Sequence, residues 1–318
     1  LKLPGVSYSD SRVWNSTDAL KLSFIPRRLL IIGGGIIGLE MASVYSALGS
    51  TIDIVDSIDQ VLSLVDIDII NQFNKITSMD FNLVLNTKIL KVDSKEDGLW
   101  VTMQTKNLSP SVIRYDAILI AIGRGAPCYL SLDIDKIGIV QNTSGFITVD
   151  AQLRTNKSHV YAIGDVLGPP MLAHKGIYQG KLVAEIISGK TVFYDPMVVP
   201  SIAYTDPEVA WVGITEKEAE RKKINYAVSV FPWKASGRAM VSIADQGCTK
   251  LIFSKDSHRI IGGTIIGSNA GELLGEITLA IEMGCEAEDI SLTMHAHPTL
   301  YETIGVSSEI FQGISIDI

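Results

Sequence analysis

The stretch that decides the fold reads Arg28-Leu-Leu-Ile-Ile-Gly-Gly-Gly-Ile-Ile-Gly-Leu-Glu40. Its aliphatic start, residues 28–32, predicts a buried strand. The pattern Gly-x-Gly-x-x-Gly then fills residues 33–38. An apolar periodicity of about 3.6 residues follows and predicts a helix that ends at Gly49. A glycine-rich turn between a strand and a helix is the first half of a βαβ unit.

A second predicted strand, residues 51–55, closes on Asp56. An acid in this place completes the dinucleotide-binding fingerprint. In that fingerprint Gly33 makes the tight turn, Gly35 lets a pyrophosphate approach the backbone, and Gly38 lets the helix pack on the strand. We expect Asp56 to bind ribose hydroxyls. Residues 57–60 contain no Arg or Lys to hold a 2′-phosphate, which favours NAD over NADP.

The remaining chain continues in the same α/β style and then changes. Helices are predicted at residues 66–77 and 173–188, and strands at 82–85, 88–92, 99–104, 116–122, 145–150 and 159–163. From residue 198 the pattern is antiparallel, with strands at 201–204, 208–213, 226–231, 248–253 and 260–266, a helix at 271–283 and a last helix to about Gly313. These patterns predict a linker over 1–27, a Rossmann-like α/β domain over 28–124, a central domain over 125–195 and an α+β domain over 196–318.

Composition excludes several classes of protein. The formal net charge of −8 argues against a nucleic-acid partner, and no apolar run approaches the roughly 20 residues that span a bilayer. The three cysteines, Cys128, Cys248 and Cys285, show no disulfide or metal spacing, so we expect no metal and a reducing, cytoplasmic setting. No signal peptide precedes the fold, and a chain that starts at Leu1 is expected to be a fragment.

A second informative stretch is Met294-His-Ala-His-Pro-Thr-Leu-Tyr-Glu-Thr-Ile304. His297 precedes a proline, and Glu302 falls in the first turn of a predicted helix. One interpretation is a general base with an orienting carboxylate. The other is a histidine packed at a helix start beside a surface glutamate, and these residues alone favour it. His295 is interpreted as structural.

Several blocks together carry a family resemblance. The chain resembles the flavin-dependent pyridine nucleotide–disulfide oxidoreductases, and within them the branch that oxidises dihydrolipoamide. The blocks are residues 33–40, Ala121-Ile-Gly-Arg124, Ala162-Ile-Gly-Asp165, Met171-Leu-Ala-His-Lys175, Tyr204-Thr-Asp-Pro-Glu-Val-Ala210, Phe231-Pro-Trp233, Ser236-Gly-Arg-Ala239 and His295-Ala-His-Pro-Thr299.

The resemblance implies cofactors, residue roles and partners. It implies electron transfer from dihydrolipoamide through a redox disulfide and FAD to NAD⁺, as in the flavoprotein of 2-oxo acid dehydrogenase complexes, with their lipoyl domains as partners. His297 matches the catalytic base and Glu302 its orienting carboxylate. Because that base serves the other subunit, a homodimer and an α+β dimerisation domain are implied. The matched cofactor positions are Gly33, Gly34, Gly35, Ile36, Ile37, Gly38, Asp56, Ile89, Ala121 and Gly123 for NAD, and Asp165 and Ala173 for FAD.

The sequence also departs from the family. It has no Cys-x₄-Cys pair and only one dinucleotide fingerprint, and Gly-Ala-Pro-Cys follows Arg124 where the family has Pro-Asn. Three hypotheses therefore stay open at this point. The chain is part of a dihydrolipoamide-oxidising enzyme, part of a related thiol or transhydrogenase flavoenzyme, or an NAD-binding, dimerising remnant without activity.

Overall fold

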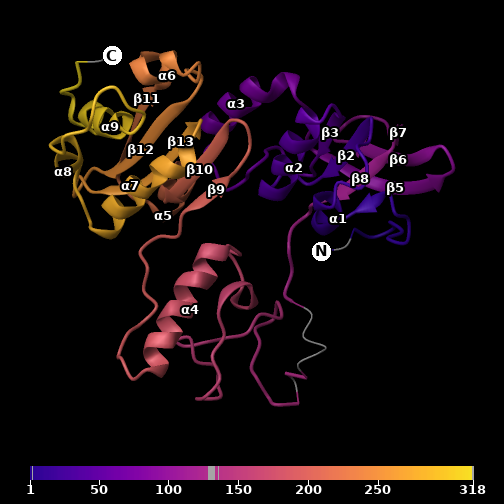
Figure 1. Ribbon diagram of the computed structural model, residues 1–318, viewed down its shortest axis with the longest axis horizontal. Coiled ribbons are helices and arrows are strands. Elements are labelled where there is room, and N and C mark those ends of the chain that lie inside the picture. The colour runs from indigo at the N-terminus through magenta and orange to yellow at the C-terminus, as the bar shows by residue number, and fades with distance from the viewer. Residues whose placement is uncertain (2, 128–132, 135, 317–318) are drawn as a thin grey trace. The chain divides into compact units, whose positions relative to one another are not determined.

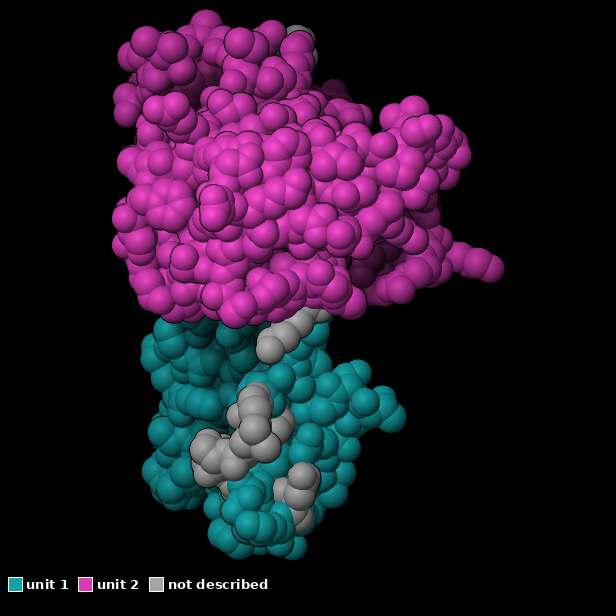
Figure 2. Space-filling view, turned by 90° about the vertical axis from the view of Figure 1, so that its right-hand side faces the viewer, with its two compact units in different colours: residues 1, 124–199 teal, residues 2–123, 200–318 magenta. Residues whose placement is uncertain are grey.

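The computed structural model describes residues 1, 3–127, 133–134 and 136–316 (Figure 1). The chain divides into two compact units (Figure 2). Residues 124–199, with residue 1, form the first unit, and residues 2–123 with 200–318 form the second. The mixed α/β class predicted from the sequence is confirmed. The predicted boundaries of the three domains, at residues 28–124, 125–195 and 196–318, stay a prediction.

The second unit contains a parallel sheet built around the glycine-rich stretch. Its strand order is β1-β8-β2-β3-β4, and every neighbouring pair is parallel. The strands are β1 (Val13–Trp14), β2 (Arg28–Ile32), β3 (Thr51–Val55), β4 (Asn82–Val84) and β8 (Ala117–Ile120). The helices beside them are α1 (Ser16–Leu20), α2 (Ile36–Ala47), α3 (Ile67–Ile76) and the 3₁₀ turn η1 (Thr77–Met79). The central strands are almost wholly aliphatic and buried, as expected for a parallel sheet covered on both faces.

A three-stranded antiparallel sheet covers one face of this parallel sheet. It is formed by β5 (Thr87–Lys95), β6 (Gly98–Thr105) and β7 (Ser111–Tyr115), and its apolar side chains share a core with Leu30, Ile32 and Val55. The sequence did not predict β7, because its alternating polar residues and short length resemble a loop.

The predicted linker over residues 1–27 needs correction. Val13 and Trp14 form β1, the edge strand beside β8, and α1 follows directly. Trp14 is buried against Tyr45 of α2, and the Tyr45 hydroxyl donates to the Ala19 carbonyl at 2.6 Å. This segment therefore belongs to the packed core, because it buries apolar side chains that a linker would leave in water.

An antiparallel sheet in the order β11-β12-β13-β10-β9 forms the C-terminal part of the same unit. The strands are β9 (Ser201–Ala203), β10 (Glu208–Gly213), β11 (Tyr226–Pro232), β12 (Cys248–Ser254) and β13 (Ile260–Gly267). The helical elements are α5 (Glu216–Lys222), η3 (Trp233–Ala235), α6 (Gly237–Val241), α7 (Ala270–Glu282), α8 (Ala287–Ser291) and α9 (Glu302–Gln312). The short α5, α6 and α8 were not predicted. No helix among the described residues has the length and apolarity to cross a membrane.

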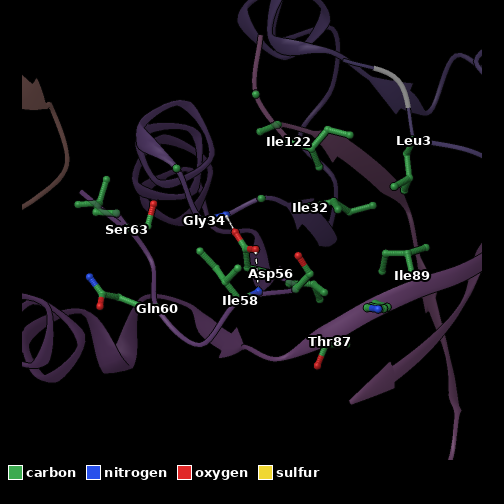
Figure 3. A pocket seen from close by; sticks show the side chains of 18 residues that line it. Leu3, Ile32, Gly34, Asp56, Ile58, Gln60, Ser63, Thr87, Ile89 and Ile122 are labelled. Atoms are coloured by element: carbon green, nitrogen blue, oxygen red, sulfur yellow. Dashed lines mark hydrogen bonds between the residues drawn. The ribbon is translucent and has the colours of Figure 1, made fainter. Parts of the chain in front are cut away.

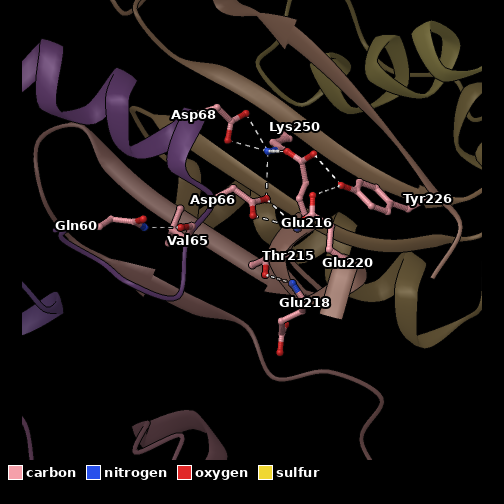
Figure 4. A network of polar contacts seen from close by, with 10 residues as sticks. All are labelled: Gln60, Val65, Asp66, Asp68, Thr215, Glu216, Glu218, Glu220, Tyr226 and Lys250. Carbon is pink, nitrogen blue, oxygen red and sulfur yellow. Dashed lines mark hydrogen bonds and ion pairs between the residues drawn. The ribbon is translucent and has the colours of Figure 1, made fainter. Parts of the chain in front are cut away.

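A buried ionic cluster, the Lys250 centre, joins the starts of α3 and α5 to the C-terminal sheet of this unit (Figure 4). The Lys250 side chain on β12 is 0% exposed. Its Nζ lies 3.1 Å from Asp66, 2.8 Å from Asp68 and 2.5 Å from Glu216. Asp66 is the N-cap residue of α3 and also accepts from the Glu216 backbone N–H at 3.0 Å. The start of α3 is thereby fixed to β12 and to α5.

The first unit contains less regular structure. Within its described residues, the helical elements are the 3₁₀ turn η2 (Gly164–Leu167) and the helix α4 (Ala173–Ile187), which was predicted. The strands predicted at 145–150 and 159–163 were wrong, since the described residues there form only isolated bridges. The physical reason is local. The Asn142 and Asp150 side chains each accept two backbone N–H groups, which replaces a strand ladder by turns.

Candidate functional site

A cavity of about 560 Å³ opens where the parallel strands end (Figure 3). It is lined by the segments that follow β2, β3 and β8, at the carboxyl edge of the sheet, where α/β folds bind ligands. Seven of the residues expected to contact a cofactor lie on its wall: Gly33, Gly34, Gly35, Asp56, Ile89, Ala121 and Gly123.

Three glycines in the turn are required by the fold itself. Gly33 has a φ of +109°, and a Cβ there would overlap the Ala121 carbonyl. A Cβ at Gly38 would overlap the Gly33 carbonyl, and one at Gly34 would lie 2.6 Å from Val61. Gly35 differs, because a Cβ there would meet no protein atom within 4 Å. Gly35 faces open space in the cavity, where a ligand can approach its backbone.

The first residues of α2 contribute backbone N–H groups. Ile36, Ile37 and Gly38 open the helix, and its N-cap, Gly35, makes no side-chain cap hydrogen bond. N–H groups in a first helical turn lack partners within the helix and attract anions. These three residues do not line the cavity with side chains. They place helix N–H groups at its edge.

Asp56 lies across the turn from these glycines (Figure 3). Its Oδ2 accepts from the Gly34 N–H at 2.7 Å, and its Oδ1 accepts from the Ile58 N–H at 3.2 Å. The half-buried carboxylate is therefore held at the cavity wall by two backbone donors. It retains further lone pairs that can accept from hydroxyl groups.

Sequence reasoning missed several residues of this wall. Leu3, Ser63, Thr87 and Lys88 also line it. Lys88 is exposed and brings the only cationic side chain among the residues that line this cavity. A basic residue directly before Ile89 was the available signal. Thr87 directly precedes Lys88, whereas Leu3 and Ser63 come from other segments whose local sequence gave no sign of the cavity.

The second candidate centre is the pair of His297 and Glu302. The His297 Nδ1 lies 3.0 Å from the Glu302 carboxylate, and the His297 side chain is 79% exposed. Glu302 opens α9, and its other oxygen accepts from the Thr299 N–H at 3.2 Å. The pair has the geometry of an exposed imidazole whose Nδ1–H is oriented by a fixed carboxylate. This leaves Nε2 as the atom that exchanges a proton with a substrate.

His295, two residues before His297, has a buried side chain. The His295 side chain is 8% exposed, and its Nε2 lies 2.7 Å from Glu276 of α7. The hydrogen bond to Glu276 raises the pKa of His295 above its usual value, against the opposing effect of burial. The structure agrees with the interpretation of His295 as a packed residue.

The two residues expected at FAD lie in the first unit. Asp165 belongs to η2, and its carboxylate pairs with Arg124 at 2.9 Å. Ala173 is the first residue of α4. The Gly164 N–H donates to the Gln179 side chain of α4 at 2.7 Å, which fixes the turn bearing Asp165 to that helix. A carboxylate and a helix N-terminus fit one edge of a nucleotide cofactor.

Among the described residues, the two cysteines and one acidic cluster lie outside these sites. Cys248 is buried, which raises the pKa of its thiol to about 12, and Cys285 is also a free thiol. Cys128 lies outside the described residues. Among the described residues, Asp66, Asp68 and Glu216 bring three carboxylates close enough to hold a cation, but the Lys250 ammonium already contacts all three.

Comparison with known families gives two matches along the chain. The sequence profile of pyridine nucleotide-disulphide oxidoreductases matches residues 1–180, and the profile of their dimerisation domain matches residues 199–307. The chain belongs to the pyridine nucleotide-disulphide oxidoreductase family. Enzymes of this family use FAD and NAD(H).

Individual relatives agree with this family. The chain is 56% identical to the dihydrolipoyl dehydrogenase of Vibrio cholerae and 57% identical to that of Buchnera aphidicola from Acyrthosiphon pisum, over all 318 residues in both cases. It spans 67% of the length of each. Among solved structures it is similar to the HOCl-induced flavoprotein disulfide reductase RclA from Escherichia coli, with a TM-score of 0.87 at 25% identity, covering 96% of this chain and 69% of that one.

Proposed function

We propose that this chain is the NAD-binding and dimer-forming part of a dihydrolipoyl dehydrogenase that oxidises protein-bound dihydrolipoyl groups with NAD⁺. The observation that carries the proposal is the His297–Glu302 pair, present in a chain that is 56–57% identical to dihydrolipoyl dehydrogenases over its whole length. An exposed, carboxylate-oriented imidazole is suited to take a proton from a dithiol.

The dinucleotide pocket supports the NAD part of the proposal. Gly35 leaves space for a pyrophosphate, and the N–H groups of Ile36 and Ile37 lie at the N-terminal end of α2, where the helix dipole favours the phosphate charge. Asp56 would accept hydrogen bonds from ribose hydroxyls. Ile89 and the backbone of Ala121 and Gly123 would form the wall along the rest of the cofactor. Bound NAD⁺ supplies the electron acceptor.

His297 would act as the base at its Nε2 atom. Its Nδ1–H donates to Glu302, which fixes the tautomer and stabilises the imidazolium after proton uptake. Because the His297 ring is largely exposed, it can reach a thiol outside the packed core. In the proposed homodimer, formed through the dimerisation domain at residues 199–307, that thiol belongs to the partner subunit.

The remaining assignments of the proposal concern FAD, partners and location. Asp165 and the N-terminus of α4 at Ala173 would hold one edge of FAD, which carries electrons between dithiol and NAD⁺ when bound. The lipoyl domains of 2-oxo acid dehydrogenase complexes are the proposed macromolecular substrates, in the cytoplasm. The proposed boundaries are 28–124 for the NAD domain, 125–195 for the central domain and 196–318 for the dimerisation domain.

The deciding experiment is a substrate comparison on the FAD-loaded holoenzyme. NADH formation is followed with dihydrolipoamide and, separately, with reduced glutathione as the electron donor. The proposal expects rapid NAD⁺ reduction with dihydrolipoamide and little with glutathione. A preparation that binds NAD⁺ and FAD but reduces NAD⁺ only with another thiol would assign the chain to a related flavoenzyme.

A further inference from the structure

We propose that His295 is a doubly protonated positioning residue whose pair with Glu276 holds the segment that presents His297. The inference rests on the proposed function for the role of His297. It assigns to His295 and Glu276 a part in the reaction that neither the fold nor the family match gives them.

The contacts of His295 fix its protonation state. Its Nδ1 lies 2.8 Å from the Thr293 carbonyl oxygen, and its Nε2 lies 2.7 Å from Glu276 Oε1. A carbonyl oxygen only accepts hydrogen bonds, and so does an ionised carboxylate. A neutral imidazole has one N–H and would leave one of these short contacts without a proton. The imidazolium donates to both, so it is the form that satisfies the geometry.

The charged groups around the ring agree with a cation. Glu276 approaches from α7, and Glu302 at the start of α9 also favours the positive charge of His295. Tyr301 is the other titratable group packed against it, with ring centroids 5.3 Å apart. Within the segment itself, His297 is the other histidine, and it pairs with the same Glu302. The field of Glu302 is therefore shared by both histidines.

The buried ring also fixes the path of the backbone toward His297. It packs against α9 so closely that a Cβ at Gly305 would lie 2.8 Å from its Nδ1. On its other side, the Tyr301 hydroxyl accepts from the Ala296 N–H at 2.8 Å. His297 follows directly and has an exposed side chain, so little packing of its own holds it. The position of its ring depends on the anchored residue two places earlier.

Three substitutions change this anchor in different ways. Glu276→Gln removes the charge of the partner, His295→Gln removes the ring, and Gly305→Ala displaces the ring without changing a titratable group. A misplaced catalytic group costs roughly 10- to 100-fold in rate. We expect each variant to lower kcat for dihydrolipoamide by about that factor while the KM for NAD⁺ stays unchanged. The matched control is Glu272→Gln, one turn earlier on α7, where the glutamate is exposed.

Protonation can be read separately from activity. Side-chain ¹⁵N spectra of the holoenzyme at neutral pH should show both ring nitrogens of His295 protonated, and Glu276→Gln should remove one proton. The free energy of unfolding should also depend on pH through His295. Because the folded-state pKa of His295 is raised, the stabilisation is present below about pH 6.5 and is lost as pH rises through the raised value. The difference in unfolding midpoint between wild type and Glu276→Gln should shrink as pH rises.

The outcomes separate this inference from the proposed function. A neutral His295 ring at pH 7, or an unchanged kcat in both Glu276→Gln and Gly305→Ala, overturns the inference. A variant that unfolds is replaced by Gly305→Ala, which keeps the ion pair chemically intact. If wild type fails to oxidise dihydrolipoamide, the proposed function fails, whereas the ¹⁵N spectrum still tests the state of His295.

Discussion

The Lys250 centre and the His297–Glu302 pair lie in the same compact unit, and in each a basic side chain contacts carboxylates. The first is buried and the second is exposed. Lys250 is fully buried and contacts three carboxylates. His297 is 79% exposed and contacts one. A buried charge whose partners come from separate elements fixes those elements, because leaving it unpaired is costly. An exposed charge with one partner is oriented but stays accessible to a substrate.

The glycine-rich turn shows the same contrast on a smaller scale. Gly33 and Gly38 are required by the backbone packing, whereas Gly35 faces open space. Asp56 lies between these extremes, because it accepts two backbone N–H groups and still lines the cavity. Residues that serve the fold and residues left for a ligand can thus be distinguished by what surrounds them.

The largest effect on stability is expected for Lys250→Met, which tests whether the Lys250 centre supports the fold. Removing one partner of a buried ionic cluster leaves uncompensated charge and costs about 3–5 kcal/mol in the free energy of unfolding. Chemical denaturation measures this, with Lys217→Met on the exposed side of α5 as the control, which should change little. A loss as small as that of the control would mean that the centre does not hold α3 and α5 to β12.

Gly35→Ala tests whether the open space at Gly35 is used by the cofactor. The methyl group meets no protein atom, so the unfolding midpoint should stay near that of wild type. It would fill space expected for a pyrophosphate, and such overpacking costs about 1–3 kcal/mol, or roughly 10- to 100-fold in NAD⁺ affinity. Calorimetric titration with NAD⁺ measures the effect. Gly33→Ala is the counterpart, expected to destabilise the fold as well. Unchanged affinity in Gly35→Ala would place the cofactor elsewhere.

The smallest expected effect belongs to Asp56→Asn. The amide keeps one acceptor oxygen, so the loss for NAD⁺ should be about 1 kcal/mol, or several-fold in affinity. NADP⁺ binding should weaken less, because the carboxylate of Asp56 repels the 2′-phosphate and the amide does not. Lys88→Met is the companion change, since it removes the cation on the cavity wall. If Asp56→Asn left the ratio of the two affinities unchanged, Asp56 would not read the ribose.

The sequence predicted the glycine-rich unit well because its signals are local. β2, α2 and β3 follow from aliphatic runs, a helical periodicity and glycines at fixed spacing. Glu302 was placed correctly in the first turn of α9 for the same reason. Glu302 lies only five residues after His297, so the pair could be predicted from one short segment.

Features that depend on distant partners were not predicted. Lys250 meets Asp68 across 182 residues and Glu216 across 34, and no local pattern connects them. Likewise Leu3 reaches the cavity wall from the start of the chain. The strands expected at 145–150 and 159–163 were wrong because side-chain acceptors satisfied the backbone instead of a neighbouring strand.

The most direct test is to measure turnover and stability on the same preparation of His297→Gln holoenzyme. The loss of a general base should lower kcat for dihydrolipoamide by roughly 10²- to 10⁴-fold. The unfolding midpoint should remain that of wild type, because the His297 side chain is exposed and packs against little. Turnover near the wild-type rate would contradict the assignment of His297 as the base. A lowered unfolding midpoint together with lowered turnover would mean that His297 supports the fold.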